Sequence, residues 1–432
     1  MKSIAPGPPL GYTGGAMHIY KMENPVQHYI WGSKTGISSC LGIPNPTDEP
    51  MAELWMGAHP KTPSFIIVDG KKHRLDEYIA EAPDACLGAG TVRRFGPGLP
   101  FLFKVLSAGQ PLSIQAHPTK QKAARGFERE ELAGIPIDAA DRNYRDRNYK
   151  PEMAVAITPF EGLYGFRPID ELLANVRLAA GSEEYFRKVA GRLERDRSRV
   201  ELSVYFYSMV AADAAAKATM LEVAKHNIDE LLDEGKLKAG QKTAFEWSKR
   251  LCGLYPGDIG ALAPLILNYI SLAPGEAVAI EPGELHAHLG GTCFEIMANS
   301  DNVVRGGLTQ KHIDVPELIS VLSFDAAPVP VLHPEKTGAG EEIYPSFVPD
   351  FQISHIQLKD GRTVERQPAS PETAGPAIYL CREGSLRLKE NADSMEIQHG
   401  ESVFVRADVD SYELSGSADV YEARLGSVPG GN

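Results

Sequence analysis

The sequence predicts a mainly β protein with an α-helical insert, and three observations support this fold class. Short runs that alternate apolar and polar residues occur from His18 onward and again from about residue 275. Residues 169–254 instead carry apolar side chains at helical spacing. These helices form one block between two β-rich parts and do not alternate with strands, which excludes a doubly wound α/β fold.

Length and composition indicate a soluble protein of several domains. The 432 residues are too many for one core, and the contents of 43% hydrophobic and 23% charged residues are typical of globular proteins. The formal net charge of −13 argues against nucleic acid or an anionic membrane as a bulk partner, so an anionic substrate needs a local basic pocket. The most apolar stretch, residues 261–280, is interrupted by two prolines, Asn268 and Glu276. We therefore expect a helix end and a strand there and no membrane span.

The cysteines and the N-terminus point to a cytoplasmic location. The five cysteines are odd in number and lack C-x-x-C spacing, which is typical of reduced thiols; they are Cys40, Cys86, Cys252, Cys293 and Cys381. Residues 1–17 are rich in glycine and proline, have no apolar signal-peptide core and are expected to form a disordered extension. A monomer is expected because no exposed apolar stripe stands out.

The predicted elements divide the chain after this extension into three parts. Residues 18–165 together with 255–325 are expected to form a first β domain, which carries the chemistry. Residues 166–254 form the helical insert. Residues 326–432 contain short alternating runs separated by turns, which predict an antiparallel sandwich or barrel with a structural role.

The segment L-S-I-Q-A-H-P at 112–118 carries the strongest chemical signal. As a strand it alternates, so Ser113, Gln115 and His117 share one face and the apolar residues share the other. An amide oxygen and an imidazole nitrogen two residues apart can both reach one metal ion. Taken alone, the pair is better explained by an ordinary hydrogen-bonded histidine.

Two further apolar strands complete a candidate metal site. Lys150 and Glu152 share one face of a strand, and His286 follows an apolar strand and a turn. Two nitrogens and two oxygens suit Zn²⁺ with open positions for substrate oxygens, whereas an iron site remains an alternative that the glutamine disfavours. The expected zinc ligands are Gln115, His117, Glu152 and His286.

Basic residues near these ligands favour a phosphorylated substrate, because phosphate prefers arginine and lysine donors. They are Lys104, Lys150, Arg305 and Lys311. A Lewis-acidic metal beside acid–base groups suits enolisation next to a carbonyl, with one proton moved between C2 and C1 of an open-chain sugar. Arg305 stays protonated and is expected to be a clamp on phosphate or enediolate. Lys150, Glu295 and Asp301 are the better proton carriers, although a loop-capping role explains Asp301 equally well.

With these motifs in place, the chain resembles the type I mannose-6-phosphate isomerases (phosphomannose isomerases) of the cupin superfamily. The resemblance runs from about residue 18 to 325 and continues more loosely to the C-terminus. The matching segments are A-E-L-W-M-G-A-H-P at 52–60, L-P-F-L-F-K-V-L-S at 99–107, L-S-I-Q-A-H-P at 112–118, Y-R-D-R-N-Y-K-P-E-M-A at 144–154, L-Y-P-G-D-I-G at 254–260 and F-E-I-M-A-N-S-D-N-V-V-R-G-G-L-T-Q-K at 294–311.

This resemblance implies two cupin jelly-roll domains, with a helical domain inserted in the first. It implies one zinc ion per chain on the four ligands above and an active-site arginine at Arg305. The implied reaction interconverts mannose 6-phosphate and fructose 6-phosphate and feeds GDP-mannose and glycan synthesis. The residues expected to contact the sugar phosphate are Lys104, Ser113, Lys311, Trp31 and His288, although packing explains Trp31 at least as well.

The sequence departs from the family pattern at two positions. Tyr149 replaces the histidine of the family motif N-H-K-P-E, and His288 stands where the family often has tyrosine. Both replacements keep a ring with a polar tip, so contact with substrate can survive. His288 is also a less favoured candidate for an extra metal ligand.

Three other functions fit parts of the sequence. A cupin that binds zinc and a sugar phosphate without turnover is the main alternative, and a metal-dependent oxygenase is the second. The third is an isomerase for a different aldose phosphate. The sequence contains no P-loop, and it contains no complete dinucleotide fingerprint at Gly88, because Arg93 stands where the third glycine is needed.

Overall fold

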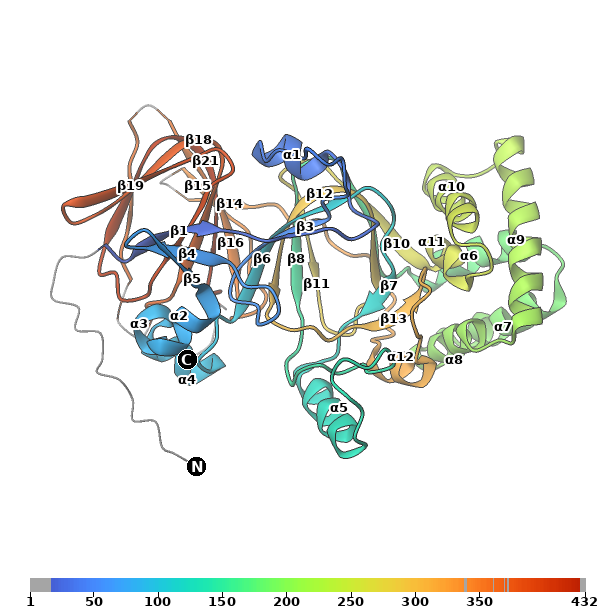
Figure 1. Ribbon diagram of the computed structural model, residues 1–432. Helices are drawn as coiled ribbons and strands as arrows, with labels where there is room; N and C mark the ends of the chain where they lie inside the picture. The colour runs from blue at the N-terminus through green and yellow to red at the C-terminus, as the bar shows by residue number, and fades with distance from the viewer. Residues whose placement is uncertain (1–16, 338–339, 360, 369, 371–372, 428–432) are drawn as a thin grey trace.

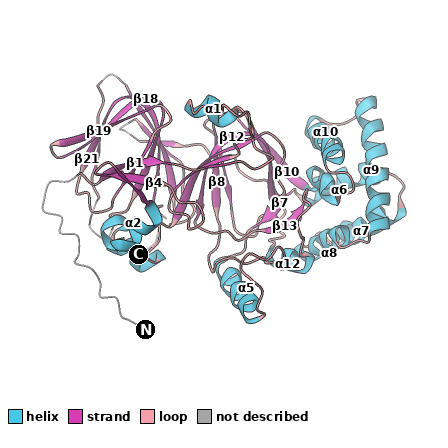
Figure 2. Cartoon of the chain, viewed as in Figure 1, coloured by secondary structure: helices cyan, strands magenta, loops and turns pink. Residues whose placement is uncertain are grey.

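The computed structural model describes residues 17–337, 340–359, 361–368, 370 and 373–427, so nearly all of the extension expected at 1–17 lies outside the described residues. Two antiparallel sheets and a block of helices follow one another across the molecule (Figure 1), and the colouring by secondary structure separates them clearly (Figure 2). Among the described helices, none has the length and apolar character needed to cross a membrane.

The central sheet contains ten strands of the described chain, all paired antiparallel. Its main path runs β10-β9-β12-β6-β3-β2, and the other four strands join through β7 and β8. The strands are β2 (Val26–Gln27), β3 (Glu53–Met56), β6 (Phe101–Ala108), β7 (Ile114–Ala116), β8 (Glu152–Ala156), β9 (Phe160–Phe166), β10 (Leu267–Leu272), β11 (Ala277–Ile280), β12 (His286–Ala298) and β13 (Val304–Gly307).

Strand β12 organises this sheet because it pairs with four others. Its first half pairs with β7 and β9, and its second half pairs with β6 and β8. The register shifts between His288 and Gly290, and Gly291 follows with a φ of 105°. A Cβ at Gly291 would lie 2.4 Å from the carbonyl oxygen of Pro159, so only glycine fits this bend. Strand β12 therefore pairs His286 with β7 and β9 before the bend, and Glu295 with β6 and β8 after it.

The second sheet contains eleven strands of the described chain and joins the two ends of the sequence. Strand β1 pairs with β20, so the N-terminal strands lie among the C-terminal ones, as the blue strands on the left of Figure 1 show. Residues 18–165 therefore contribute strands to both sheets. The strands are β1 (Ile19–Glu23), β4 (Phe65–Val68), β5 (Lys71–Arg74), β14 (Glu335–Lys336), β15 (Glu341–Ile343), β16 (Gln352–Leu358), β17 (Val364–Arg366), β18 (Ala377–Glu390), β19 (Asp393–Gln398), β20 (Ser402–Val405) and β21 (Tyr412–Arg424).

Helices occupy most of residues 169–254, as the spacing of the apolar residues predicts, and they lie between β9 and β10 in the chain. Asp213 and Ser198 cap two of them by accepting hydrogen bonds from backbone amides of the first turn. The helices are α1 (Gly36–Leu41), α2 (Leu75–Glu81), α3 (Pro83–Leu87), α4 (Ala89–Phe95), α5 (Lys120–Leu132), α6 (Ile169–Ala180), α7 (Glu184–Arg195), α8 (Arg199–Val210), α9 (Ala214–Glu234), α10 (Ala239–Leu254), α11 (Ala263–Ile266) and α12 (Val315–Val321), with a 3₁₀ turn η1 (Ile259–Leu262).

The packing of β7 confirms how its side chains are divided between its faces. Ile114 and Ala116 are buried in one apolar cluster with the helices α6, α8 and α10. Gln115, between them, is only half-buried. The helices therefore cover one face of β7 and leave its polar face for the site.

Candidate metal centre

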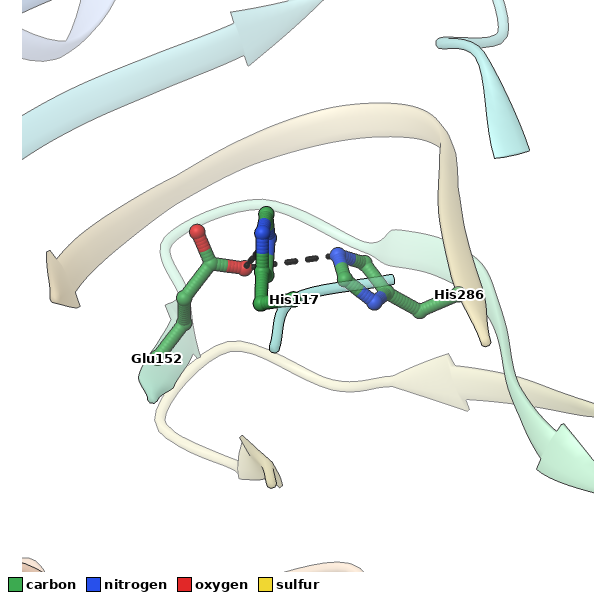
Figure 3. Close-up of side chains that lie close together, drawn as sticks. All are labelled: His117, Glu152 and His286. Atoms are coloured by element: carbon green, nitrogen blue, oxygen red, sulfur yellow. Dashed lines mark ion pairs between the residues drawn. The ribbon is translucent and has the colours of Figure 1, made fainter. Parts of the chain in front are cut away.

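Three side chains from separate strands meet in the central sheet. His117 follows β7, Glu152 begins β8 and His286 begins β12, and Figure 3 shows their polar atoms turned toward one another. One ligand atom of each lies within 4.8 Å of the others. Glu152 Oε2 is 3.4 Å from His117 Nε2 and 3.3 Å from His286 Nε2. All three side chains are buried.

Backbone carbonyl groups orient both imidazole rings. His117 Nδ1 donates to the carbonyl oxygen of Asn302 at 2.7 Å, and His286 Nδ1 donates to that of Glu284 at 3.0 Å. A carbonyl oxygen only accepts, so the proton is on Nδ1 in each ring and the Nε2 lone pair faces the centre. Burial, assisted by the charge of Lys150, lowers the pKa of His117 to about 4. The ring is therefore neutral near pH 7, as a metal ligand must be.

The three facing atoms have no hydrogen-bond partner. His117 Nε2, Glu152 Oε2 and His286 Nε2 are all buried and unsatisfied within the described part of the chain. An unsatisfied buried polar group costs about 1–3 kcal/mol. A divalent cation would satisfy all three at once, so these residues fit a metal ion.

Gln115 lies where it can join this centre. It is the direct neighbour of His286 across one side of β7 and of Arg305 across the other. Directly opposed residues on antiparallel strands point to the same face, so the three side chains share a face. Ser113, immediately before β7, is half-buried.

Lys150 contacts the carboxylate of the centre. Its Nζ is 2.7 Å from Glu152 Oε1, the oxygen that the histidines do not face. Burial by itself raises the pKa of Glu152, but Lys150 and His117 hold it well below the usual value. Glu152 is therefore ionised and has one oxygen free for a metal.

A second buried charge network lies in the same sheet. Lys104 Nζ is 2.8 Å from Glu295 Oε2 and 3.5 Å from Glu53 Oε1. Burial alone lowers the pKa of Lys104, but the two carboxylates raise it overall. Burial alone raises the pKa of Glu295, and Lys104 brings it down to about 2. Lys104 is thus already neutralised by protein carboxylates.

Sequence reasoning missed Glu53 as a member of this network. Glu53 also accepts a hydrogen bond of 2.8 Å from Trp55 Nε1. The available signal was the alternation in A-E-L-W, which places Glu53 and Trp55 on one face of a strand that is otherwise apolar.

His288 is buried in this network and has both ring nitrogens occupied. Nε2 lies 3.2 Å from Glu295 Oε1, and Nδ1 lies 3.0 Å from the hydroxyl of Tyr164. Because the ionised carboxylate only accepts, Nε2 donates to Glu295 and the Tyr164 hydroxyl donates to Nδ1. The metal-ligand group of the described chain does not include His288.

Asp301 is paired with two cationic or protonatable side chains. Its carboxylate lies 3.2 Å from His59 Nε2 and 2.7 Å from Lys61 Nζ. Burial raises the pKa of Asp301, but the hydrogen bonds from His59 and Lys61 hold it below the usual value. His59 is buried against Trp55, with ring centroids 4.8 Å apart.

Two aromatic residues singled out by the sequence have clear contacts. Trp31 is half-buried and stacks on Tyr29 with ring centroids 5.6 Å apart, and its carbonyl oxygen accepts two backbone hydrogen bonds. The hydroxyl of Tyr149 donates to the carboxylate of Asp350, which comes from the C-terminal part of the chain. This hydrogen bond therefore joins the segment before β8 of the central sheet to the segment before β16 of the second sheet.

The fold and the site define a class of protein: an antiparallel β protein with a buried two-histidine, one-carboxylate centre suited to a divalent metal. A family model described as phosphomannose isomerase type I, catalytic domain, matches residues 19–169. The mannose-6-phosphate isomerase of Escherichia coli (strain K12) is 38% identical over 400 residues, which cover 92% of this chain and 97% of that protein. The human mannose-6-phosphate isomerase is 33% identical, with 91% and 94% covered.

Solved structures give the same result. A single-site mutant of phosphomannose isomerase from Salmonella typhimurium superposes with a TM-score of 0.85 at 36% identity and covers 95% of this chain and 100% of its own. A zinc-bound mannose 6-phosphate isomerase superposes with a TM-score of 0.83 at 36% identity, with the same coverage. The chain belongs to the type I phosphomannose isomerase family and is an isomerase.

Proposed function

We propose that this isomerase uses zinc to interconvert mannose 6-phosphate and fructose 6-phosphate through an enediol. The observation that carries the proposal is the set of three buried, facing and unsatisfied atoms of His117, Glu152 and His286. The relatives named mannose-6-phosphate isomerase and the zinc-bound neighbour support it.

The donor set favours zinc. Two imidazole nitrogens, a carboxylate oxygen and the nearby amide of Gln115 include no thiolate, which is the pattern of an open catalytic site and not of a closed structural one. When bound, zinc supplies a Lewis acid that polarises the substrate oxygens at C1 and C2.

The reaction needs one proton carrier and no external oxidant, because a hydrogen leaves C2 as a proton and a proton is added at C1. Glu295 and Asp301 are held in ion pairs that lower their pKa values, which makes them weak bases. We therefore assign proton transfer to Lys150, whose ammonium contacts the ligand Glu152 and has to release its own proton before the amine can take one from C2.

The other candidate residues are proposed to bind the substrate or to position the groups that do. Arg305 and Lys311 are proposed to hold the phosphate, and Ser113 and Trp31 to contact the sugar. Lys104 and His288, which were expected to contact the substrate, are instead proposed to keep Glu295 in place through the network described above.

The family resemblance supports further proposals on fold and context. We propose that both sheets are cupin-type jelly rolls and that α6 to α10 form a helical insert in the first. We also propose a cytoplasmic monomer whose product supplies GDP-mannose and glycan synthesis.

The test is to incubate the full-length zinc-loaded protein with mannose 6-phosphate and to detect fructose 6-phosphate in an enzyme-coupled assay, with mannose as the unphosphorylated control. Turnover of the phosphorylated sugar alone is the expected result. Binding without turnover would support the sugar-phosphate-binding protein instead. Turnover of another aldose phosphate in preference to mannose 6-phosphate would overturn the substrate assignment.

A further inference from the structure

The basic side chains near the centre fall into two groups according to their partners. Lys104 and Lys150 contact buried carboxylates. Arg305 and Lys311 have no carboxylate within ion-pair distance in the described part of the chain, and neither does Arg145, a residue that the sequence did not single out. Three basic residues are thus left with their charges uncompensated.

The positive charges of Arg145, Arg305 and Lys311 repel one another. The pKa of Arg305 is lowered by burial and then by Arg145, and the pKa of Lys311 is lowered by burial and then by both arginines. Arg305 and Arg145 are half-buried, so water screens this repulsion incompletely. A group of cations without protein counter-charges is the arrangement that a phosphate dianion neutralises.

The position of Arg145 is fixed by Asn302, which is fully buried. Asn302 Oδ1 accepts hydrogen bonds from the backbone amides of Arg145 at 2.7 Å and Asp146 at 3.2 Å. Its Nδ2 donates to the carbonyl oxygens of Asp146 at 2.9 Å and Asn148 at 2.8 Å. These four hydrogen bonds tie Asn302 to three residues of the turn, namely Arg145, Asp146 and Asn148.

The same residue contacts the metal centre. The carbonyl oxygen of Asn302 accepts the hydrogen bond of His117 Nδ1, and Arg305 follows three residues later in β13, directly opposite Gln115. Asn302 thus joins the backbone of Arg145 to a metal ligand through hydrogen bonds of 2.7 Å on either side.

We propose that Arg145 binds the substrate phosphate together with Arg305 and Lys311, and that Asn302 holds this phosphate site at a fixed separation from the metal ligands. The inference rests on the proposed function and deepens it. A fixed separation selects sugar phosphates by the number of carbons between the reacting C1–C2 pair and the phosphate, and so favours a hexose 6-phosphate over a pentose 5-phosphate.

The main test compares Arg145→Gln with Arg147→Gln in the full-length protein. Arg147 is two residues away on the same turn, but it is exposed and paired with Glu128, so it serves as the matched control. Inorganic phosphate is the probe, measured by calorimetry and as a competitive inhibitor. We expect Arg145→Gln to weaken phosphate binding and raise KM for mannose 6-phosphate about tenfold or more, with kcat little changed. Arg147→Gln should change neither quantity.

The second part of the test uses variants of Asn302. Asn302→Ala should weaken both phosphate binding and zinc binding, the latter measured by chelator competition, whereas Arg145→Gln should weaken phosphate binding alone. If the alanine variant does not fold, Asn302→Asp keeps the acceptor for Arg145 and removes the donor to Asn148, and it should show the same double loss. A folded Asn302 variant that keeps both affinities would overturn the positioning role.

The outcomes separate this inference from the proposed function. Phosphate affinity and KM equal to wild type in folded Arg145→Gln would overturn the inference, even if the wild-type protein converts mannose 6-phosphate. Loss of phosphate affinity in Arg145→Gln, in a protein that does not convert mannose 6-phosphate, would support the phosphate site and overturn the proposed function.

Discussion

Lys104 and Glu295 face each other on adjacent strands, with Lys104 Nζ 2.8 Å from Glu295 Oε2. Both are buried, so each charge depends on the other. Removal of one partner from a buried ion pair leaves an uncompensated charge and costs about 3–5 kcal/mol, whereas removal of both is often nearly neutral.

Lys104→Met should therefore lower the free energy of unfolding by about 3–5 kcal/mol. Urea unfolding measures this change. The double variant Lys104→Met/Glu295→Leu should recover part of this loss, because only the Glu53 carboxylate is then left without its lysine partner. A single variant with wild-type stability would contradict the ion-pair account.

His288→Phe should lower stability because it leaves two buried groups without partners. The Tyr164 hydroxyl loses its acceptor and Glu295 Oε1 loses its donor, at about 1–3 kcal/mol for each group. Thermal unfolding measures the loss. The matched control is Tyr164→Phe, which should cost less because it removes only the bond to Nδ1. Equal stability of His288→Phe and wild type would show that the network is not formed in solution.

Zinc should stabilise the protein through its three buried ligands. At a zinc concentration a hundred times the dissociation constant, the free energy of unfolding should rise by about 2.7 kcal/mol. His286→Ala should lose this increase, whereas His226→Ala should keep it, because His226 is exposed on α9 and pairs with Glu230. Calorimetry with and without zinc gives the comparison, and a zinc effect that survives in His286→Ala would place the metal elsewhere.

The stability contributed by His355 should depend on pH. Its ring nitrogens lie 3.1 Å from Asp419 and 3.2 Å from Glu342. Burial by itself lowers the pKa of His355, but these two carboxylates raise it overall. A group with a raised pKa in the folded state stabilises below its unfolded pKa, about 6.5 for histidine, and loses that contribution as pH rises through the folded value.

His355→Gln should therefore destabilise the protein more at pH 5.5 than at pH 9, as measured by urea unfolding at both pH values. Asp419 belongs to the same cluster, and its pKa is held at about 2 by His355 and Arg382 against the effect of burial. Equal destabilisation at the two pH values would contradict the charged state of His355.

The sequence predicted those parts of the site that depend on local alternation. The period of two in 112–118 placed Gln115 on the polar face and its apolar neighbours in the core, as the structure confirms. The strands that carry Glu152 and His286 were likewise expected, and their side chains meet. The choice of mannose 6-phosphate as the substrate rests on the family resemblance.

The long-range pairings were not predictable from local patterns. An alternating run such as β1 shows a strand but not its partner, and β20 lies nearly 400 positions away in the chain. In the same way, the sequence predicts that Lys104 binds substrate, whereas in the structure Glu53 and Glu295 neutralise its charge. The sequence does not single out Arg145, because only the tertiary structure shows that no carboxylate of the described residues lies within ion-pair distance of it.

The most direct test of the central claim is the rate of fructose 6-phosphate formation from mannose 6-phosphate through one cycle of chelation and zinc re-addition. The account predicts turnover that is lost when zinc is removed and returns when it is restored at one zinc ion per chain. Full turnover in a metal-free protein, or none in a folded protein with zinc bound at His117, Glu152 and His286, would contradict it.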